Sequence, residues 1–559
     1  MKLNKFSRII TQKKQNGSAQ AMLYALGLDD KDLKKPQIGI GSVWFDGNPC
    51  NSKLNILSDS IKKSVESNGF LGMRFNTVGV SDGKTMGTDA MRYSLPSREL
   101  ITDSMESIIN AEHYDANILI PGCDKNLPAS AMALARVNRP GFIIYGGSMK
   151  PSYEIVNGSM EKLDIVSSFE AYGRYIKGEI DDKNRQKIVE NSCHQSCGSC
   201  SGFYTANTMA CILEVMGLTL PNSSSNMSLS NEKMIECDNS FSVINKLLEN
   251  DIKPLDIMNR ESFLNAVKFL TLIGGSTNGV IHLLAMARTA GVDLTLEDFK
   301  KYENLPVLTN MKPHGNYVMD DLHKIGGTSV LIKYLIDNDI INGDCLTITS
   351  KSLYENTKYC EEINFNQKLI FPIKEPFKKT SHINILTGNM APNGCVTKIY
   401  SENKIFSGEA IVFNTQEEML KSLENGEIKE NNFVILRYQG ESTGCPEMLT
   451  PTSALVGYFN SRNNKRVPPF ATDGRFSGGS TGVLVAHLPD AYKDNSITSL
   501  IEDGDKITID INNNNINLDV SEEKLLERKK NLKKPNLELS GYLNKYRKLV
   551  SSLEDGYLT

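Results

Sequence analysis

The 559-residue sequence contains no long hydrophobic run. No segment reaches the roughly 18 consecutive apolar residues that suggest a membrane span. The opening stretch, MKLNKFSRIITQKKQNGSAQ, is basic, but it lacks the continuous apolar region and the small-residue cleavage site of a secretory signal. These absences predict a cytoplasmic protein with no membrane partner, with an organellar matrix as the alternative if a transit peptide has been removed.

A strong excess of one charge is also missing. Lys and Arg together number 62, Asp and Glu number 66, and the formal net charge is -4. Proteins that bind nucleic acids concentrate positive charge, so this balance favours a small-molecule partner over a nucleic acid. We find no internal repeat, and the one low-complexity tract is a short Asn run at 512–515.

The eleven cysteines do not have the pattern of a disulfide framework. Their number is odd, they are scattered through a long chain, and no secretory signal accompanies them. We therefore expect reduced thiols, most of them buried as small hydrophobic residues and a few of them metal ligands.

The length of the chain favours two domains. Up to about residue 340, short Ile-rich runs at 116–122 and 141–147 alternate with helical patterns, for example at 129–137 and from 276 onward. This alternation is typical of an α/β domain with a mostly parallel sheet.

Past about residue 365 the sequence changes to β-type segments such as INILTGN, CVTKIY and NFVILRY. The stretch FPIKEPFKK at 371–379, rich in Pro and Lys, is the predicted linker. The predicted fold class is α/β, with an N-terminal α/β domain at 1–370 and a C-terminal β-rich, barrel-like domain at 371–559.

Three cysteines in the stretch NSCHQSCGSCSG, namely Cys193, Cys197 and Cys200, have the spacing CxxxCxxC. This spacing is similar to the cluster loop of radical S-adenosylmethionine enzymes, although Ser199 stands where those enzymes usually have an aromatic residue. A zinc site would need a fourth ligand, for which His194 is the local candidate, and the spacing disfavours it. Cys200 differs from the other two because it lies just before a predicted helix, whose N-terminus stabilises a thiolate.

The stretch PGCDKN places Cys123, Asp124 and Lys125 in a turn between a predicted strand and a predicted helix. In open α/β sheets, ligands bind in the crevice outside the carboxyl ends of the strands. A turn with one buried cysteine and a solvated Asp-Lys pair is the plainer interpretation, but its position favours a ligand site.

Nine motifs occur in order over nearly the whole chain, from about residue 8 to residue 552: NPCN, VSDG, GCDKN, GSCSGFYTANTM, GGSTNGVIHLLAMA, MDDLHKIGG, LTGNMAPNG, PEMLTPTSA and DGRFSGGSTG. Together they closely resemble the dihydroxy-acid dehydratases of branched-chain amino-acid biosynthesis, which share a family with the sugar-acid and phosphogluconate dehydratases. An ordered set of motifs is far more specific than any one of them.

The resemblance implies an iron-sulfur cluster. In the family, one cysteine from each of three separated motifs binds the cluster, which implies Cys50, Cys123 and Cys200 here, and a 2Fe-2S cluster is favoured over 4Fe-4S. Cys193 and Cys197 are then expected to be local packing residues. A homodimer is implied by the resemblance alone.

The resemblance also implies a magnesium ion and a catalytic base. The implied magnesium ligands are Asp82, Asp124, Lys125 in carbamylated form and Glu447, and Ser477 takes the position of the base. Two segments depart from the family pattern, a short loop at 441–446 and a long segment at 458–470. Both flank the groups that the C-terminal half contributes.

The implied reaction is the dehydration of 2,3-dihydroxy-3-methylbutanoate, and of its methylpentanoate homologue, to the 2-oxo acid. Three thiolates are one fewer than the usual four ligands of a cluster, so one iron can act as a Lewis acid for the leaving 3-hydroxyl. Magnesium can stabilise the charge that develops when C2 loses its proton. The alternatives are a sugar-acid dehydratase with the same cluster, a non-catalytic iron-sulfur or zinc protein used in sensing or scaffolding, and a radical enzyme.

Overall fold

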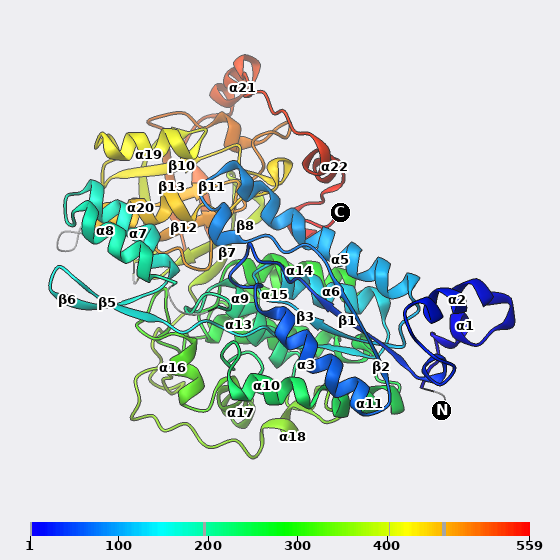
Figure 1. Cartoon of the computed structure of the whole chain (residues 1–559). Coiled ribbons are helices and arrows are strands. Elements are labelled where there is room, and N and C mark those ends of the chain that lie inside the picture. Colours follow the sequence, from blue (N-terminus) through cyan, green and yellow to red (C-terminus); the bar gives the residue numbers. More distant parts are fainter. Residues whose placement is uncertain (1–2, 194–196, 402, 461–465) are drawn as a thin grey trace.

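The computed structural model describes residues 3–193, 197–401, 403–460 and 466–559 (Figure 1). Its N-terminal half surrounds a four-stranded sheet and its C-terminal half forms a closed barrel of eight strands. The predicted α/β class and the barrel-like C-terminal region are confirmed. The division of the chain at residue 370 stays a prediction.

The sheet has the strand order β2-β1-β3-β4, and all neighbouring strands are parallel. Its strands are β1 (Gln37–Ser42), β2 (Leu71–Asn76), β3 (Ala116–Ile120) and β4 (Gly141–Ile143). All residues of β1 and β3 are buried, as expected for central strands of a parallel sheet that is covered on both faces. β3 and β4 lie within the two runs predicted as strands.

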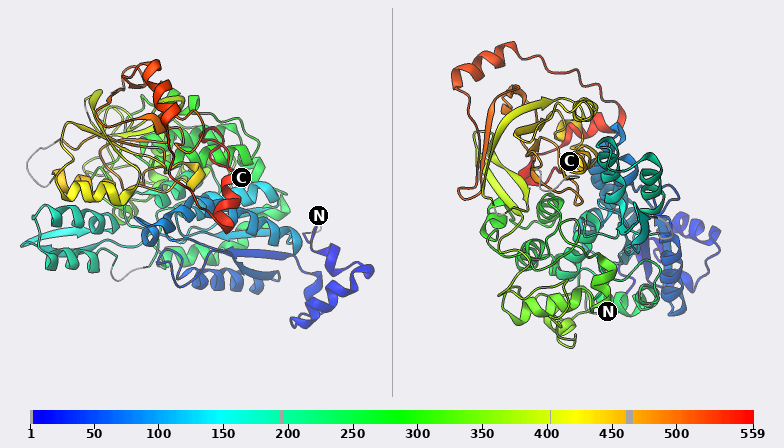
Figure 2. Two further views of the ribbon diagram at one scale, coloured as in Figure 1. Left: turned by 90° about the horizontal axis from the view of Figure 1, so that it is seen from above. Right: turned by 90° about the vertical axis from the view of Figure 1, so that its left-hand side faces the viewer.

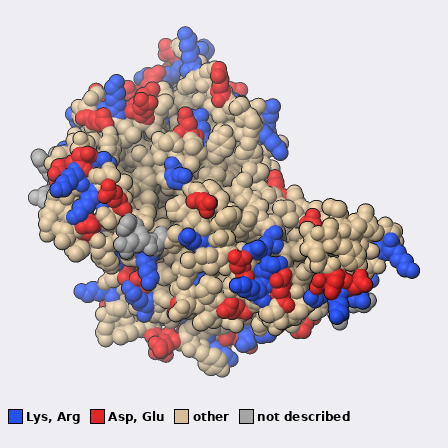
Figure 3. Space-filling model, viewed as in Figure 1, with Lys and Arg blue, Asp and Glu red and all other residues tan. Residues whose placement is uncertain are grey.

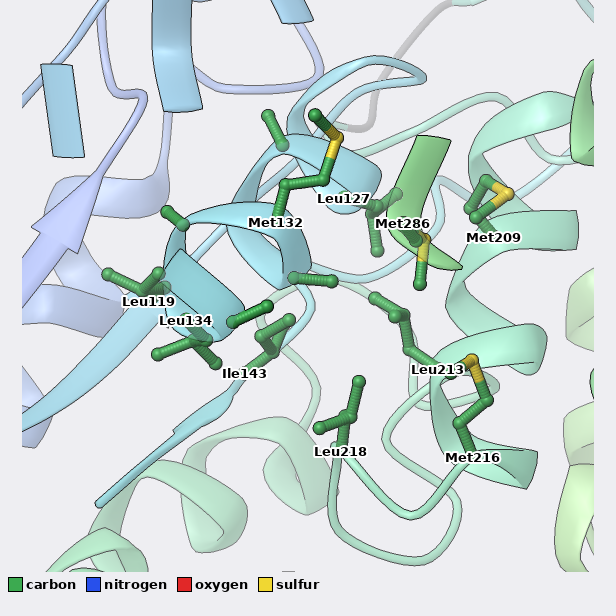
Figure 4. Close-up of a cluster of buried hydrophobic side chains, with 14 of the residues drawn as sticks. Leu119, Leu127, Met132, Leu134, Ile143, Met209, Leu213, Met216, Leu218 and Met286 are labelled. Atoms are coloured by element: carbon green, nitrogen blue, oxygen red, sulfur yellow. The ribbon is translucent and has the colours of Figure 1, made fainter. Parts of the chain in front are cut away.

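A set of buried helices packs against the sheet and forms the main core (Figure 4). They are α6 (Asn126–Val137), α9 (Thr205–Val215) and α14 (Asn278–Thr289), with α3 (Leu54–Ser67) and α5 (Ser94–Ala111) beside them. Nearly every residue of α6, α9 and α14 is buried, because these helices are apolar around their whole circumference. Their N-termini are therefore held on a close-packed base.

The other helices of this half cover its flanks, and a hairpin of β5 (Ser152–Val156) and β6 (Ser159–Leu163) extends from it. These helices are α1 (Arg8–Thr11), α2 (Gly17–Ala25), α4 (Asp82–Thr85), α7 (Ile165–Ile176), α8 (Asp182–Asn191), α10 (Asn231–Asp238), α11 (Ser240–Glu249), α12 (Pro254–Ile257), α13 (Arg260–Leu272), α15 (Leu296–Lys301), α16 (Met319–Lys324), α17 (Thr328–Asp337) and α18 (Leu353–Thr357). α1 and α2 project from the body of the molecule (Figures 1 and 2).

The barrel has the strand order β10-β11-β12-β8-β7-β14-β13-β9 and mixes parallel and antiparallel pairs. Its strands are β7 (Ile383–Gly388), β8 (Ala391–Ile399), β9 (Ile405–Phe413), β10 (Asn432–Leu436), β11 (Phe470–Thr472), β12 (Val483–Ala486), β13 (Lys506–Asp510) and β14 (Asn515–Leu518). Four helices accompany them: α19 (Gln416–Glu424), α20 (Leu449–Asn460), α21 (Glu522–Asn531) and α22 (Gly541–Leu549). Apolar side chains from most strands fill a separate core.

Two glycines let the halves of the chain approach closely. A Cβ added at Gly173 in α7 would lie 2.9 Å from the Cα of Gly457 in α20, and 2.5 Å from the carbonyl oxygen of Ala454. Because α20 begins two residues after Glu447, this contact helps to set the position of that carboxylate relative to the N-terminal half.

Charges of both signs are interspersed on the face shown in Figure 3. In the described ranges, no helix combines the length and the apolar character needed to cross a membrane. All eleven cysteines lie in the described part of the chain and all are free, as the sequence predicts.

Candidate active site

Loops from the N-terminal half converge on one cavity beyond the carboxyl ends of the sheet strands. The cavity has a volume of about 250 Å³ and is closed on the other side by residues from the C-terminal half. Six of the predicted site residues line it: Cys50, Cys123, Cys200, Asp82, Asp124 and Ser477. The remaining two, Lys125 and Glu447, bond to each other directly behind it.

The thiols of Cys50, Cys123 and Cys200 lie together although their positions in the sequence are far apart. Hydrogen bonds from Cys123 and Cys200 are the main reason that the pKa of the Cys50 thiol is raised well above its usual value, and burial adds to this. Three thiolates cannot share this space without a positive partner. A bound metal centre would provide that partner.

Asparagine side chains hold the three cysteine loops. Asn48 Oδ1 accepts a hydrogen bond from Cys50 N at 3.0 Å, and Asn126 Oδ1 accepts one from Cys123 N at 2.8 Å. Asn207 Nδ2 donates to the carbonyl of Cys200 at 2.7 Å. These asparagines belong to motifs that the sequence singles out, but the sequence alone assigned them no role.

Cys193 lines the same cavity as the three converging cysteines. Burial, with a smaller effect of the neighbouring Cys200, raises the pKa of the Cys193 thiol to about 12. Cys197 is half-buried and does not line the cavity. His194, the local candidate for a zinc ligand, lies outside the described residues.

The carboxylates of Asp82, Asp124 and Glu447 form a compact group. One oxygen of each lies within 4.8 Å of the others. Asp82 begins α4, Asp124 precedes α6, and Glu447 comes from the segment before α20. Burial raises the pKa of Asp124 to about 7; the charge of Lys125 acts against this, and the charges of Asp82 and Glu447 add to it.

Lys125 lies among these carboxylates. Its Nζ contacts Asp82, lies 2.7 Å from Glu447 Oε1 and is 3.6 Å from Asp124 Oδ2. Burial favours the neutral form of Glu447, but Lys125 and Arg475 outweigh it and lower the pKa of Glu447 to about 2. The second oxygen, Glu447 Oε2, is buried and has no hydrogen-bond partner among the described residues.

Arg475 is a site residue to which the sequence assigned no role. Its fully buried guanidinium pairs with Glu447 and donates to the Cys445 carbonyl at 2.7 Å and to Ser94 Oγ at 3.2 Å. Asn278, the first residue of α14, donates to Glu447 Oε1 at 3.0 Å. Both residues lie in quoted motifs, and only the assembled structure brings them to the carboxylates.

Ser477 lies in the connection between β11 and β12 and is 7% exposed. Its hydroxyl is beside Glu447 and contributes to the low pKa of that carboxylate. Glu447 and Arg475 pair as an isolated parallel bridge, and Met448 N donates to the Arg475 carbonyl at 2.8 Å. The backbone thus fixes the position of Ser477 relative to the acidic group.

The short loop at 441–446 presents a backbone carbonyl to the site. Gly444 has φ +90°, and a Cβ there would lie 2.2 Å from the carbonyl oxygen of Arg92, so only glycine fits. The turn brings the Cys445 carbonyl to Arg475. Of the long segment at 458–470, residues 461–465 lie outside the described residues.

One wall of the cavity is apolar. It consists of Met86, Met149, Ile165, Val166, Phe169 and Leu449, of which Met86, Phe169 and Leu449 pack together in one apolar cluster. This arrangement suits a small ligand with one polar end and one apolar end.

Comparisons with known proteins agree over the whole chain. Residues 35–356 match the family model described as dihydroxy-acid/6-phosphogluconate dehydratase N-terminal, and residues 368–557 match its C-terminal counterpart. The chain is 48% identical over 563 residues to a dihydroxy-acid dehydratase of Francisella tularensis subsp. novicida, covering 100% of this chain and 99% of that relative. It is 46% identical to the mitochondrial dihydroxy-acid dehydratase of Saccharomyces cerevisiae, covering 99% and 96%. It is 45% identical to the dihydroxy-acid dehydratase of Flavobacterium psychrophilum, covering 100% and 99%.

Proposed function

The chain belongs to the dihydroxy-acid/6-phosphogluconate dehydratase family and is a hydro-lyase, and on this premise we propose that it converts 2,3-dihydroxy-3-methylbutanoate and 2,3-dihydroxy-3-methylpentanoate to their 2-oxo acids. These are the dehydration steps of valine and isoleucine biosynthesis. The related activity on sugar acids or phosphogluconate is the second candidate.

The observation that carries the choice of substrate is the apolar wall of the cavity. A branched alkyl group would pack against Ile165, Phe169 and Leu449, while the carboxylate and hydroxyls would face the polar side. A sugar acid has hydroxyl groups along its whole length, and those that met this wall would be buried without hydrogen bonds. The wall therefore favours the branched-chain substrates.

The three converging thiols fit an iron-sulfur cluster. Cys50, Cys123 and Cys200 are free, adjacent and short of positive charge, which is the donor set that iron-sulfur clusters use. When bound, a cluster with three protein ligands supplies an iron with an open position, a Lewis acid for the 3-hydroxyl group. We expect a 2Fe-2S cluster, which measurement of iron and acid-labile sulfide per chain would distinguish from 4Fe-4S.

The acidic group fits a magnesium ion. Asp82, Asp124 and Glu447 offer hard oxygen ligands, and the unpartnered Glu447 Oε2 is an acceptor that a cation would satisfy. Arg475 and Asn278 contact the other oxygen of Glu447, Oε1, and Arg475 also bonds to Ser94. These contacts orient the ligands.

Lys125 would join the magnesium ligands as a carbamate. As an ammonium it occupies the centre of the carboxylates and would repel a divalent cation. Carbamylation adds carbon dioxide to the nitrogen and releases two protons, so the side-chain charge changes from +1 to −1, and magnesium would restore two positive charges. The net charge of the buried group is therefore the same in both states, which makes the exchange electrostatically feasible.

Ser477 would act as the base. As an oxyanion, Ser477 would take the proton from C2, and the C–H electron pair would form the C2=C3 bond. The 3-hydroxyl group would depart as hydroxide, accept that proton and be released as water. The resulting enol tautomerises to the 2-oxo acid, so no oxidant or reductant is needed. A free serine hydroxyl is too weak a base for this step, so the Ser477 turn must be held where positive charge stabilises its oxyanion.

The substrate test uses anaerobically purified protein with magnesium. We expect 2-oxo acid from 2,3-dihydroxy-3-methylbutanoate, and little or none from gluconate or 6-phosphogluconate. Turnover of a sugar acid alone would keep the chemistry and overturn the substrate. Activity on none of them, with a cluster visible in the absorption spectrum, would favour a sensing role instead.

The role of Ser477 can be tested against a neighbour in the same turn. Ser477→Ala should lower kcat by roughly 10²- to 10⁴-fold, the usual contribution of a positioned acid or base. Ser480→Ala is the matched control, because Ser480 is also buried, its hydroxyl has no partner among the described residues, and its bond to Ser477 is made by the backbone. Equal losses in the two variants would contradict the assignment of Ser477 as the base.

We further propose a cytoplasmic homodimer. The assembly rests on family resemblance, and light scattering of the purified protein would give the mass directly. The location rests on the free thiols, which are typical of reducing compartments. The yeast relative is named as mitochondrial, so fractionation of cells is the relevant measurement.

A further inference from the structure

Lys398 is buried in the barrel wall. It lies on β8, opposite Ile383 of β7 and Leu484 of β12, and it is only 1% exposed. Its Nζ donates a hydrogen bond to the carbonyl oxygen of Gly478, the residue after Ser477, at 2.7 Å. Among the described residues, no carboxylate lies within ion-pair distance of this nitrogen.

The surroundings of Lys398 do not favour its charge. Burial lowers the pKa of Lys398 to about 7, although Glu447 acts in the opposite direction from further away. The neighbouring titratable groups on this side are mostly basic: His314, His382 and Lys378. A buried amine without an anionic partner destabilises the fold, and such residues occur preferentially at functional sites.

The turn that Lys398 contacts is confined on its other side by the N-terminal half. A Cβ added at Gly478 would lie 2.6 Å from Thr205 N and 2.7 Å from the Cα of Tyr204, at the start of α9. A Cβ at Gly479 would lie 2.5 Å from Val166. The Ser477 turn is thus held between the start of α9 and the Lys398 side chain.

We propose that Lys398 is a positioning residue for Ser477, holding the Gly478 carbonyl so that the Ser477 hydroxyl faces the substrate. This inference rests on the proposed role of Ser477 as the base. Without the bond, the Gly478 carbonyl would be left unpaired in a buried site, and the turn would shift to find another donor. A displacement of about 1 Å at a reacting group costs on the order of 10²-fold in rate.

The test compares three variants by steady-state kinetics on 2,3-dihydroxy-3-methylbutanoate. Lys398→Met keeps the length of the side chain but removes the donor, and it should lower kcat by roughly 10- to 100-fold with KM changed less than about threefold. Lys398→Arg restores a donor and should recover most of the lost kcat. Lys378→Met is the control: Lys378 belongs to the same basic cluster, over the ring of Tyr400 at 4.2 Å, and bonds to no residue of the turn.

The outcomes separate this inference from the proposed function. If the wild-type protein does not dehydrate the substrate, the proposed function fails first. If the wild type is active and Lys398→Met has the same kcat, the positioning role alone is overturned. Loss of activity together with loss of iron or a lower unfolding temperature, without recovery in Lys398→Arg, would mean a purely structural lysine and would also overturn it. If Lys398→Met does not fold, Lys398→Leu, which also lacks a donor for the Gly478 carbonyl, takes its place in the same comparison.

Discussion

Cys193 and Cys200 line one cavity, yet their surroundings differ. The Cys200 thiol lies within hydrogen-bonding distance of the Cys50 thiol, and Asn207 fixes the loop that carries Cys200. For Cys193, burial is the main cause of the raised pKa, about 12, and the charge of the neighbouring Cys200 adds less. We therefore expect that the spacing CxxxCxxC does not define a cluster site.

This difference predicts the iron content of cysteine variants. Cys200→Ser should lose most of the iron, whereas Cys193→Ser and Cys197→Ser should retain it, because the proposed cluster ligands come from three separate loops. Iron per chain and the visible absorption after anaerobic reconstitution measure this without reference to activity. Loss of iron from Cys193→Ser and Cys197→Ser as well would favour the radical-enzyme alternative.

The sequence predicted the site residues to which a recognisable motif assigns a role. It missed those whose role depends on contacts between distant parts of the chain. Cys123 and Asp124 follow a strand that composition alone identifies, and the family resemblance supplied Glu447 and Ser477. Arg475 was missed because its partners Asn278 and Ser94 lie 197 and 381 residues away in the sequence. No local pattern encodes such a contact, since it exists only when the two halves pack together.

The helices and strands show the same limit: local sequence predicts an element, but not its partners. Strands β3 and β4 and helices α6 and α14 were predicted because buried runs bounded by Gly or Pro have clear signals. Several barrel strands, among them β7, β8 and β10, were predicted, but β11, β12 and β14 were not, and neither was the pairing of the strands. β10 pairs with β9 and β11, and β7 pairs with β14 about 130 residues later, so closure depends on non-local contacts that alternation along one strand does not specify.

A histidine that joins two elements should make the fold acid-sensitive. His382, just before β7, contacts the Gly275 carbonyl through Nε2 at 2.6 Å, in the turn that precedes α14. Burial lowers the pKa of His382 from 6.5 to about 3, and the charges of Lys398 and Lys378 lower it further, against the hydrogen bond to Gly275. The folded protein therefore keeps this histidine neutral where the unfolded chain would bind a proton.

Stability should fall as the pH drops below 6.5. The contribution of His382 to the free energy of unfolding is complete above the unfolded-state pKa and is lost progressively toward pH 3. Lowering the pH from 7 to 5 should therefore reduce the free energy of unfolding by about 2 kcal/mol through this residue. His382→Gln should reduce the difference between thermal unfolding midpoints at pH 7 and pH 5, measured at one scan rate. His323→Gln, at a half-buried residue of α16, is the control. An unchanged pH difference in His382→Gln would contradict the prediction.

At the scale of the whole molecule, the C-terminal segment connects the two halves. Gly556 packs so closely on α14 that an added Cβ would lie 2.5 Å from Ala285 N. The hydroxyl of Tyr557 lies 3.0 Å from Nδ1 of His487, which follows β12 of the barrel. The end of the chain thus contacts a central helix of one half and the barrel of the other, close to Arg475 and the acidic group.

Arg98 fixes this segment to α5, and its loss should weaken the whole assembly. Its guanidinium is fully buried and donates to the carbonyls of Gly556 at 2.7 Å and Tyr557 at 3.0 Å, while Nε lies 2.8 Å from Glu99. Arg98→Met would leave two buried carbonyls without their donor and would remove the nearest cation from Glu99, whose other partners, Thr559 N at 3.4 Å and Arg136 at 4.0 Å, are more distant. The free energy of unfolding should therefore fall by about 3–5 kcal/mol.

Arg288 provides the matched control, because it pairs with Asp555 of the same segment at 2.9 Å but with both side chains roughly half exposed. Solvent screens that pair, so Arg288→Met should cost only about 0–1 kcal/mol. Thermal unfolding and retained iron, measured side by side, test whether burial decides the difference. Equal losses in the two variants would mean that the segment is held by its apolar contacts and not by the buried arginine, because those contacts are the same in both proteins.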